Sequence, residues 1–270
     1  MRKQGSNARR SLLTRPVWRA AIAALFWLAL WVLAARAVGL PLLLPTPWAV
    51  LARLAALCMQ APFWQAVGAS MGRAVVGYAW GVGLGAVLAA ATCAWPLLDA
   101  LLRPALRAIR AMPVASFIIL ALVWMGSDRV PVLTGALMVL PVVWGNVAQG
   151  IEAVDGQLLE MARVFRFSPM RRVRRVVIPS VLPTFLAACE TAMGLCWKAS
   201  IAAEVLGVPR RAIGTQLYQA KIYLETDALL AWTLAVVVLS VVLERAFALG
   251  VRALRAPRAA EGGTRDAVRS

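Results

Sequence analysis

The sequence predicts an all-α fold: a polytopic membrane protein of about six transmembrane helices, with a cytoplasmic helix between the fourth and fifth spans. Three observations support this prediction. Of the 270 residues, 61% are hydrophobic and 15% are charged, and the mean hydropathy of +0.75 is too high for a soluble domain of this length. The apolar residues form runs near the roughly 20 residues that cross a bilayer. The basic residues gather between those runs, where they orient a membrane protein.

The amino terminus is a basic segment, residues 1–16, followed by the first apolar run, residues 17–35. A basic segment before an apolar run also occurs in secretory signals, which are removed from the mature protein. The run here has nearly the length of a bilayer span, so an uncleaved anchor is the better interpretation. We therefore expect the first span at residues 17–35.

Residues 36–73 are expected to form an outer loop that contains a short helix. Pro45, Pro47 and Pro62 bracket an amphipathic piece in this loop. Proline favours the start of a helix and interrupts its interior, so the piece should be a separate helix. We expect it to lie in the outer membrane interface, with Trp48 at the depth of the headgroups.

The remaining five spans lie in a core at residues 74–250. They are expected at residues 74–95, 105–125, 131–148, 176–205 and 228–243. The second of these five begins with Arg107 and Arg110, whose long side chains can reach the headgroups from a helix end. Residues 251–270 are charged and contain glycine, and we expect a disordered cytoplasmic tail.

The distribution of basic residues predicts that both termini are cytoplasmic. With the amino terminus inside, 21 of the 29 lysines and arginines fall in cytoplasmic segments and seven in outer loops. Cytoplasmic loops retain positive charge during insertion, so this orientation is the favoured one. The net charge of +17 could also suggest a nucleic-acid partner, but the arginines are not gathered on one soluble domain. We expect no nucleic acid.

Glycines recur along the span at 74–95. Gly77, Gly81 and Gly85 are four residues apart, and Gly68 and Gly72 extend the series backwards. A glycine face lets two helix backbones approach closely, so this face is expected to pack against a neighbouring helix. Chance spacing in a glycine-rich span is the alternative.

The loop at residues 149–175 contains an amphipathic helix. Its apolar side comprises Val154, Leu158, Leu159, Ala162 and Phe165, and its charged side comprises Asp155, Glu160, Arg163 and Arg166. A bilayer would reject this many charges in succession, so the helix must lie in water or against a partner. We interpret it as a partner-binding element.

Catalysis by the chain alone is not expected. Histidine is absent, which excludes imidazole bases and triads that need one. The three lysines, Lys3, Lys198 and Lys221, do not occur in a P-loop, so the chain should not hydrolyse ATP. The four cysteines have no CxxC pairing and are expected to be buried free thiols, with no metal site.

Three ionisable residues lie in the fifth span: Glu190, Lys198 and Glu204. Each would cost about 2.5 to 3.5 kcal/mol at the centre of a lipid-exposed helix, so they should face the bundle interior or a wet cavity. They could line a translocation path, with Lys198 as the contact for an anionic solute. They could equally be paired or interfacial charges that orient one helix, which suits Glu204 near the outer end.

The loop also carries a recognisable motif. Glu160, Met161 and Ala162 stand where one family has Glu-Ala-Ala, and Pro179 matches the proline that opens the next span. Arg166 stands where that family has glycine. Further similar stretches are LPTPWAV near the first span and those at residues 112–126, 145–155, 193–207 and 224–232. Over residues 35–250 the chain resembles the permease subunits of bacterial ATP-binding-cassette importers, in particular the nitrate, taurine and aliphatic-sulfonate group.

This resemblance implies a permease core that dimerises around a central path in the inner membrane, as a homodimer or with a sister chain. It implies that two cytoplasmic ATPase subunits, which bind ATP and magnesium, each receive one coupling helix. Leu159, Glu160, Ala162, Phe165 and Arg166 are the expected contacts. A periplasmic binding protein would deliver the solute, a small anion of the sulfonate, taurine or nitrate type. The alternatives are an ion-coupled secondary transporter that uses Glu190, Lys198 and Glu204, and a membrane scaffold without transport.

Overall fold

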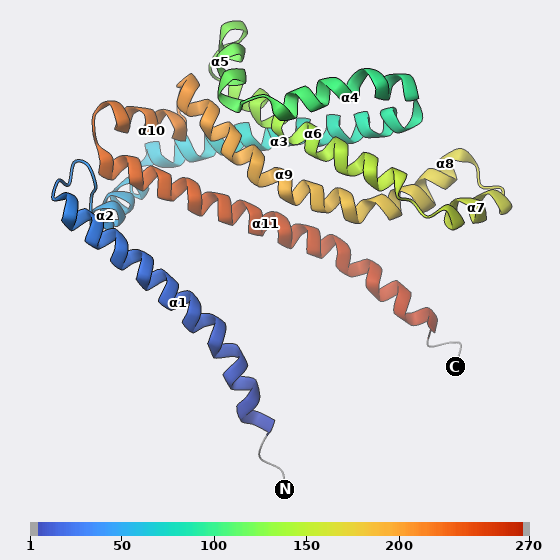
Figure 1. Ribbon diagram of the computed structural model, residues 1–270, viewed down its shortest axis with the longest axis horizontal. Helices are drawn as coiled ribbons and strands as arrows, with labels where there is room; N and C mark the ends of the chain where they lie inside the picture. Colours follow the sequence, from blue (N-terminus) through green and yellow to red (C-terminus); the bar gives the residue numbers. More distant parts are fainter. Residues whose placement is uncertain (1–4, 267–270) are drawn as a thin grey trace.

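The structure is a computed structural model that describes the backbone of residues 5–266 and the side chains of residues 18–251. Within this part the chain forms helices joined by short loops (Figure 1). In chain order they are α1 (Gly5–Val38), α2 (Pro47–Cys58), α3 (Ala61–Ala94), α4 (Pro96–Ala111), α5 (Val114–Trp124), α6 (Val130–Glu152), α7 (Gly156–Val164), α8 (Pro169–Arg172), the π-helical turn η1 (Val173–Val177), α9 (Ile178–Gly207), α10 (Ile213–Ile222) and α11 (Thr226–Asp266).

The expected all-α membrane architecture is confirmed. In the described residues, five helical segments are long and apolar enough to cross a bilayer, and α4 with α5 makes a sixth if the bent pair counts as one span. The segment Pro169–Gly207 runs without interruption through α8, η1 and α9. The basic residues 1–4 and 267–270 lie outside the described part of the chain.

The third span is not the continuous helix that we expected at residues 105–125. α4 ends at Ala111, α5 begins at Val114, and the two axes differ by 107°. Met112 between them is extended, with φ −72° and ψ 131°. Pro113 causes the break, because a proline disfavours helical geometry in the residue before it and has no N–H for the helix.

Three long helices, α3, α6 and α9, form the centre of the protein, with α6 packed against both others. The expected glycine face carries the α3–α6 contact. A Cβ atom on Gly81 would lie 2.5 Å from Val139 Cβ and 2.7 Å from the Ala136 carbonyl oxygen. Gly77 and Gly85 are equally close to the α6 backbone. The backward extension was wrong, since Gly68 and Gly72 face open space.

A second group of contacts lies at the end of α3 where α2, α10 and the start of α11 gather (Figure 1). Phe63 of α3 stacks on Trp232 of α11 at 4.8 Å between ring centroids. The expected short helix of the outer loop is present as α2, and proline stands in its first turn. The loop is shorter than expected, because α3 begins at Ala61 with Pro62 in its first turn, a favourable position for proline.

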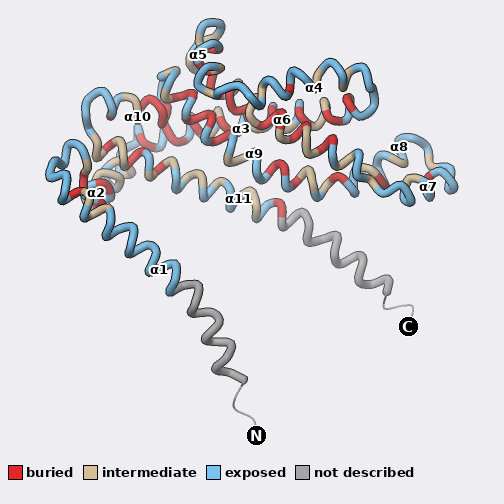
Figure 2. Tube along the Cα trace, viewed as in Figure 1, coloured by how far each residue is buried: buried red, intermediate tan, exposed pale blue. Residues whose placement is uncertain are grey.

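Two helices depart from this body. α1 contacts only α2 closely among the described elements, and its side chains are exposed from residue 18 to residue 30 (Figure 2). α11 leaves the body towards the carboxyl terminus and continues as a helix to Asp266. The backbone of the expected disordered tail is therefore helical over most of its length, since its alanines and arginines are good helix formers.

Candidate functional site

The expected partner-binding helix is α7, at the end of the molecule opposite α2 and α10 (Figure 1). Asp155 caps its start, because a side-chain oxygen accepts the Gln157 backbone N–H at 2.8 Å. Ala162 is buried, with 1% of its surface exposed, and α7 contacts η1. Its short side chain therefore attaches α7 to the rest of the protein.

The free apolar face of α7 lies beside the one we expected. Phe165 is 67% exposed and Val164 is 78% exposed, and Leu158 and Met161 are exposed as well. Leu159 is only half-buried on the other flank. Sequence analysis missed Met161 and Val164, because it could not say which apolar residues the chain itself covers. We name Leu158, Met161, Val164 and Phe165 the α7 face.

Two charged residues of the expected contact set, Glu160 and Arg166, are exposed on the same helix and its end. Arg166 has φ +50°, the left-handed conformation that glycine adopts most readily. The Arg166 N–H donates to the Arg163 carbonyl at 2.9 Å, and the Phe167 N–H donates to the Ala162 carbonyl at 2.9 Å. These two hydrogen bonds are the pattern of a helix ending that usually contains glycine. The turn of the family glycine is thus made here by an arginine.

The three ionisable residues of the fifth span do not form one group. Glu204 is fully buried, with 0% of its surface exposed, whereas Glu190 and Lys198 are exposed on α9. The Glu204 carboxylate accepts the Ser70 hydroxyl at 2.7 Å and the Gly214 backbone N–H at 3.2 Å. Its other oxygen lies 3.1 Å from Nη1 of Arg73. Glu204 is therefore a paired charge within the helix packing, the second of our two interpretations.

Arg73 extends this network across the end of the bundle where α10 lies. Its Nη2 atom lies 3.2 Å from Asp128 Oδ1 and donates to the Arg210 carbonyl at 2.8 Å. Ser70 accepts the Ile213 backbone N–H at 2.9 Å while it donates to Glu204. The network joins α3, the loop before α6, α9 and the segment that leads into α10. Sequence analysis missed Ser70 and Arg73, because nothing in their spacing indicates a partner about 130 residues away.

Glu190 and Lys198 lie on one exposed face of α9. The face also contains Ala187, Thr191, Leu195, Ala202 and Leu206, at successive helical turns. Neither charge has an ion-pair partner within 4.0 Å among the residues that the structure describes. A lipid-exposed charge near the centre of a span costs about 2.5 to 3.5 kcal/mol. This face, which we name the α9 face, therefore requires water or a further protein surface.

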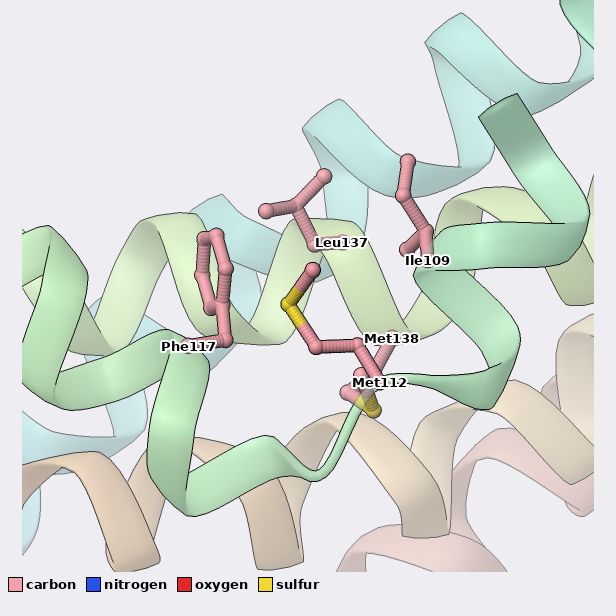
Figure 3. Close-up of a pocket in the computed structure, with 5 residues that line it drawn as sticks. All are labelled: Ile109, Met112, Phe117, Leu137 and Met138. Atoms are coloured by element: carbon pink, nitrogen blue, oxygen red, sulfur yellow. The ribbon is translucent and has the colours of Figure 1, made fainter.

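A cavity of about 170 Å³ lies at the break between α4 and α5 (Figure 3). Its side chains come from α4, the linker, α5 and α6: Ile109, Met112, Phe117, Leu137 and Met138. None of them carries a strong hydrogen-bond donor, so the cavity offers nothing to hold an anion. It can accept only an apolar group. Sequence analysis missed it, because it depends on the 107° bend.

Known transport proteins are similar to this chain in sequence. The family model described as "Binding-protein-dependent transport system inner membrane component" matches residues 81–256. The taurine transport system permease protein TauC of Escherichia coli (strain K12) is 26% identical over 83% of this chain and 82% of its own. A protein of Bacillus subtilis (strain 168) named as an aliphatic sulfonates transport permease, SsuC, is 28% identical over 70% of this chain and 68% of its own.

Solved structures show the same fold. A chain of an amino acid ABC transporter matches with a TM-score of 0.58, at 18% identity, over 68% of this chain and 89% of that one. A chain of the MetNI methionine ABC transporter in an inward-facing conformation matches with a TM-score of 0.56, at 17% identity, over 70% and 93%. The family match spans well over half of the sequence. The chain belongs to the family of inner-membrane components of binding-protein-dependent transport systems.

Proposed function

We propose that this permease subunit carries a small anionic solute, of the sulfonate, taurine or nitrate type, through an ATP-driven importer in the bacterial inner membrane. The α9 face is the observation that carries this proposal. It presents Lys198 and Glu190 at membrane depth without a partner among the described residues. Lys198 would attract an anion, and the relatives named for taurine and sulfonates carry solutes of this chemistry.

A second permease subunit would complete the path. Ala187 and Ala202 on the α9 face are small, and small residues let transmembrane helices approach closely. Two copies related by a twofold axis would place the charges of both α9 faces around one polar passage instead of in lipid. A homodimer is the simplest assembly that does this with one chain.

ATP and magnesium would be bound by separate cytoplasmic subunits. The α7 face, with Glu160 and Arg166 beside it, would enter a groove on such a subunit, in the helix-in-groove mode of recognition. Leu159 and Ala162 would hold α7 to its own chain, so that movement of the ATPase turns the whole end of the bundle. Both termini and α7 would then be cytoplasmic, and a periplasmic binding protein would deliver solute near α10.

Phe165→Asp tests this contact. The tagged chain is purified from gently solubilised membranes, and co-purifying proteins are identified and assayed for ATPase activity. We expect the wild-type chain to co-purify with a P-loop ATPase. The Phe165→Asp variant should recover at least tenfold less of this ATPase, because a carboxylate would be buried in an apolar groove. Gln157→Asp is the control, since it adds the same charge to the exposed first turn of α7.

Recovery of the ATPase with Phe165→Asp at the wild-type level would contradict the docking surface. Absence of any ATPase from both preparations, with a folded inserted protein, would contradict the importer proposal itself. Ion-coupled secondary transport is not favoured by the family match. It would be indicated by uptake that persists without an ATPase and collapses with an uncoupler.

A further inference from the structure

A strongly basic pocket lies next to α7, at the junction of α8 and η1. It has a volume of about 470 Å³ and is lined by Ser168, Met170, Arg171, Arg174 and Arg175. The arginines stand three and four residues apart, so a helical chain brings them to one side. We name this group the basic pocket. The importer function does not use it.

The charges of this pocket are not neutralised within the described residues. No carboxylate there lies within 4.0 Å of Arg171, Arg174 or Arg175. Arg171 lies over the ring of Phe167 at 5.8 Å, which orients its guanidinium without changing its charge. Three cations that share one open pocket attract an anion.

The pocket lies at the entrance of a membrane span. η1 leads without a break into α9, and Arg175 precedes Ile178 by three residues. Met170 is 76% exposed and Ile178 is 53% exposed, beside the arginines. Guanidinium groups next to exposed apolar side chains match the boundary between headgroups and acyl chains.

We propose that the basic pocket binds the phosphate of an anionic phospholipid such as phosphatidylglycerol. Arginine forks form paired hydrogen bonds with phosphate oxygens, and pockets of this kind suit anionic headgroups on the cytoplasmic side. Met170 and Ile178 contact the adjoining acyl chains. A lipid explains these exposed apolar side chains at the start of a span, which a free phosphate in solution leaves uncovered.

The test is native mass spectrometry of the full chain in its assembled complex, released from nanodiscs of phosphatidylglycerol and phosphatidylcholine. The variant is Arg174→Gln/Arg175→Gln. Its matched control is Arg107→Gln/Arg245→Gln, which removes two arginines that are also exposed and lie outside the pocket. We expect the first variant to retain at least fivefold less phosphatidylglycerol than wild type, and the control to stay within twofold.

A second arm adds inorganic phosphate to the wild-type nanodiscs and leaves retention unchanged, because the lipid is held at its acyl chains as well. Displacement by inorganic phosphate would overturn the proposal in favour of a free anion. Equal losses of phosphatidylglycerol from the variant and the control would overturn the proposal in favour of a general attraction between basic residues and anionic lipid. Unchanged lipid retention together with loss of the co-purifying ATPase would assign the arginines to a protein contact, and would also overturn it.

Discussion

At the scale of single residues, the Glu204 carboxylate and the Arg73 guanidinium are the most consequential pair. Glu204 is completely buried and the Arg73 side chain is 15% exposed. Removal of one partner from a buried pair leaves an uncompensated charge, which costs far more than the net value of the pair. The Ser70 hydroxyl and the Gly214 N–H add two hydrogen bonds but no charge.

We expect Arg73→Met to lower the stability of the protein by about 3 to 5 kcal/mol. Arg73→Met/Glu204→Gln should recover part of this loss, because the remaining side chain is neutral. The measurement is the thermal unfolding midpoint in detergent for both variants and for Glu204→Gln, which completes a double-mutant cycle. Arg53→Met is the control, since Arg53 pairs with Glu225 and Asp227 at the surface, with all three side chains at least 39% exposed, and each such pair should be worth about 1 kcal/mol or less. An equal effect of Arg73→Met and Arg53→Met would argue against a buried pair.

Arg166 ends α7 in a backbone conformation that glycine usually adopts. A left-handed residue other than glycine costs about 1 to 2 kcal/mol, and Arg166 at φ +50° carries this cost at the end of α7. The same helix ending occurs at Leu224, with φ +57°, after α10. Both turns keep their hydrogen bonds, so a residue other than glycine at these positions lowers the stability of the turn and leaves its hydrogen-bond pattern intact.

At the scale of helices, the packing of α3 on α6 depends on the absence of side chains at three positions. Gly77, Gly81 and Gly85 let the two backbones approach, and van der Waals contact between close helices replaces the hydrophobic effect inside a bilayer. Between α4 and α5 a side chain has the opposite effect, because Pro113 separates the amphipathic α4 from the apolar α5.

Gly81→Ala should destabilise the protein by about 1 to 3 kcal/mol, because the added methyl group would overlap Val139 and the Ala136 carbonyl. Gly83→Ala on the same helix is the matched control. A Cβ atom there meets nothing within 4 Å, so no loss is expected. Thermal unfolding of the two purified variants makes the comparison, and equal midpoints would contradict the close α3–α6 contact.

At the scale of the whole molecule, the described chain leaves two surfaces incomplete: the α7 face and the α9 face. The first is apolar and outside the spans, and the second carries charge within a span. A single chain in a bilayer leaves both without suitable surroundings. The two partners that we propose, an ATPase for the α7 face and a second permease subunit for the α9 face, would cover both surfaces.

Lys198→Glu tests the second surface. We expect at least a tenfold loss of anion uptake, measured in cells with labelled taurine, an alkanesulfonate and nitrate, because a carboxylate would repel the anion that we propose Lys198 attracts. Membrane insertion and recovery of the ATPase should stay at wild-type levels. Lys198→Arg, which keeps the charge, should transport normally. Unchanged uptake of every solute by Lys198→Glu would remove Lys198 from the path and favour a scaffold.

The sequence by itself determined those features of the fold that depend on a local pattern of residues. The length of the apolar runs predicted five of the six spans as helices near their observed positions, and the charged interruption predicted α7. The four-residue glycine spacing predicted a close helix contact, confirmed at Gly77, Gly81 and Gly85. These features follow from hydropathy and helical period, which neighbouring residues in the chain specify.

Tertiary structure alone decided which faces are covered. The periodicity of α7 indicated a broad apolar side, and only the folded chain showed that Ala162 faces inward while Val164 faces outward. Glu204 and Lys198 are both ionisable residues within the fifth span, and the sequence does not show which of them is buried. In the fold, Arg73 and Ser70 contact Glu204, whereas Lys198 is exposed. The physical reason is the same in both cases. Burial and charge pairing depend on residues brought together from distant parts of the chain, and a local sequence pattern does not specify which residues those are.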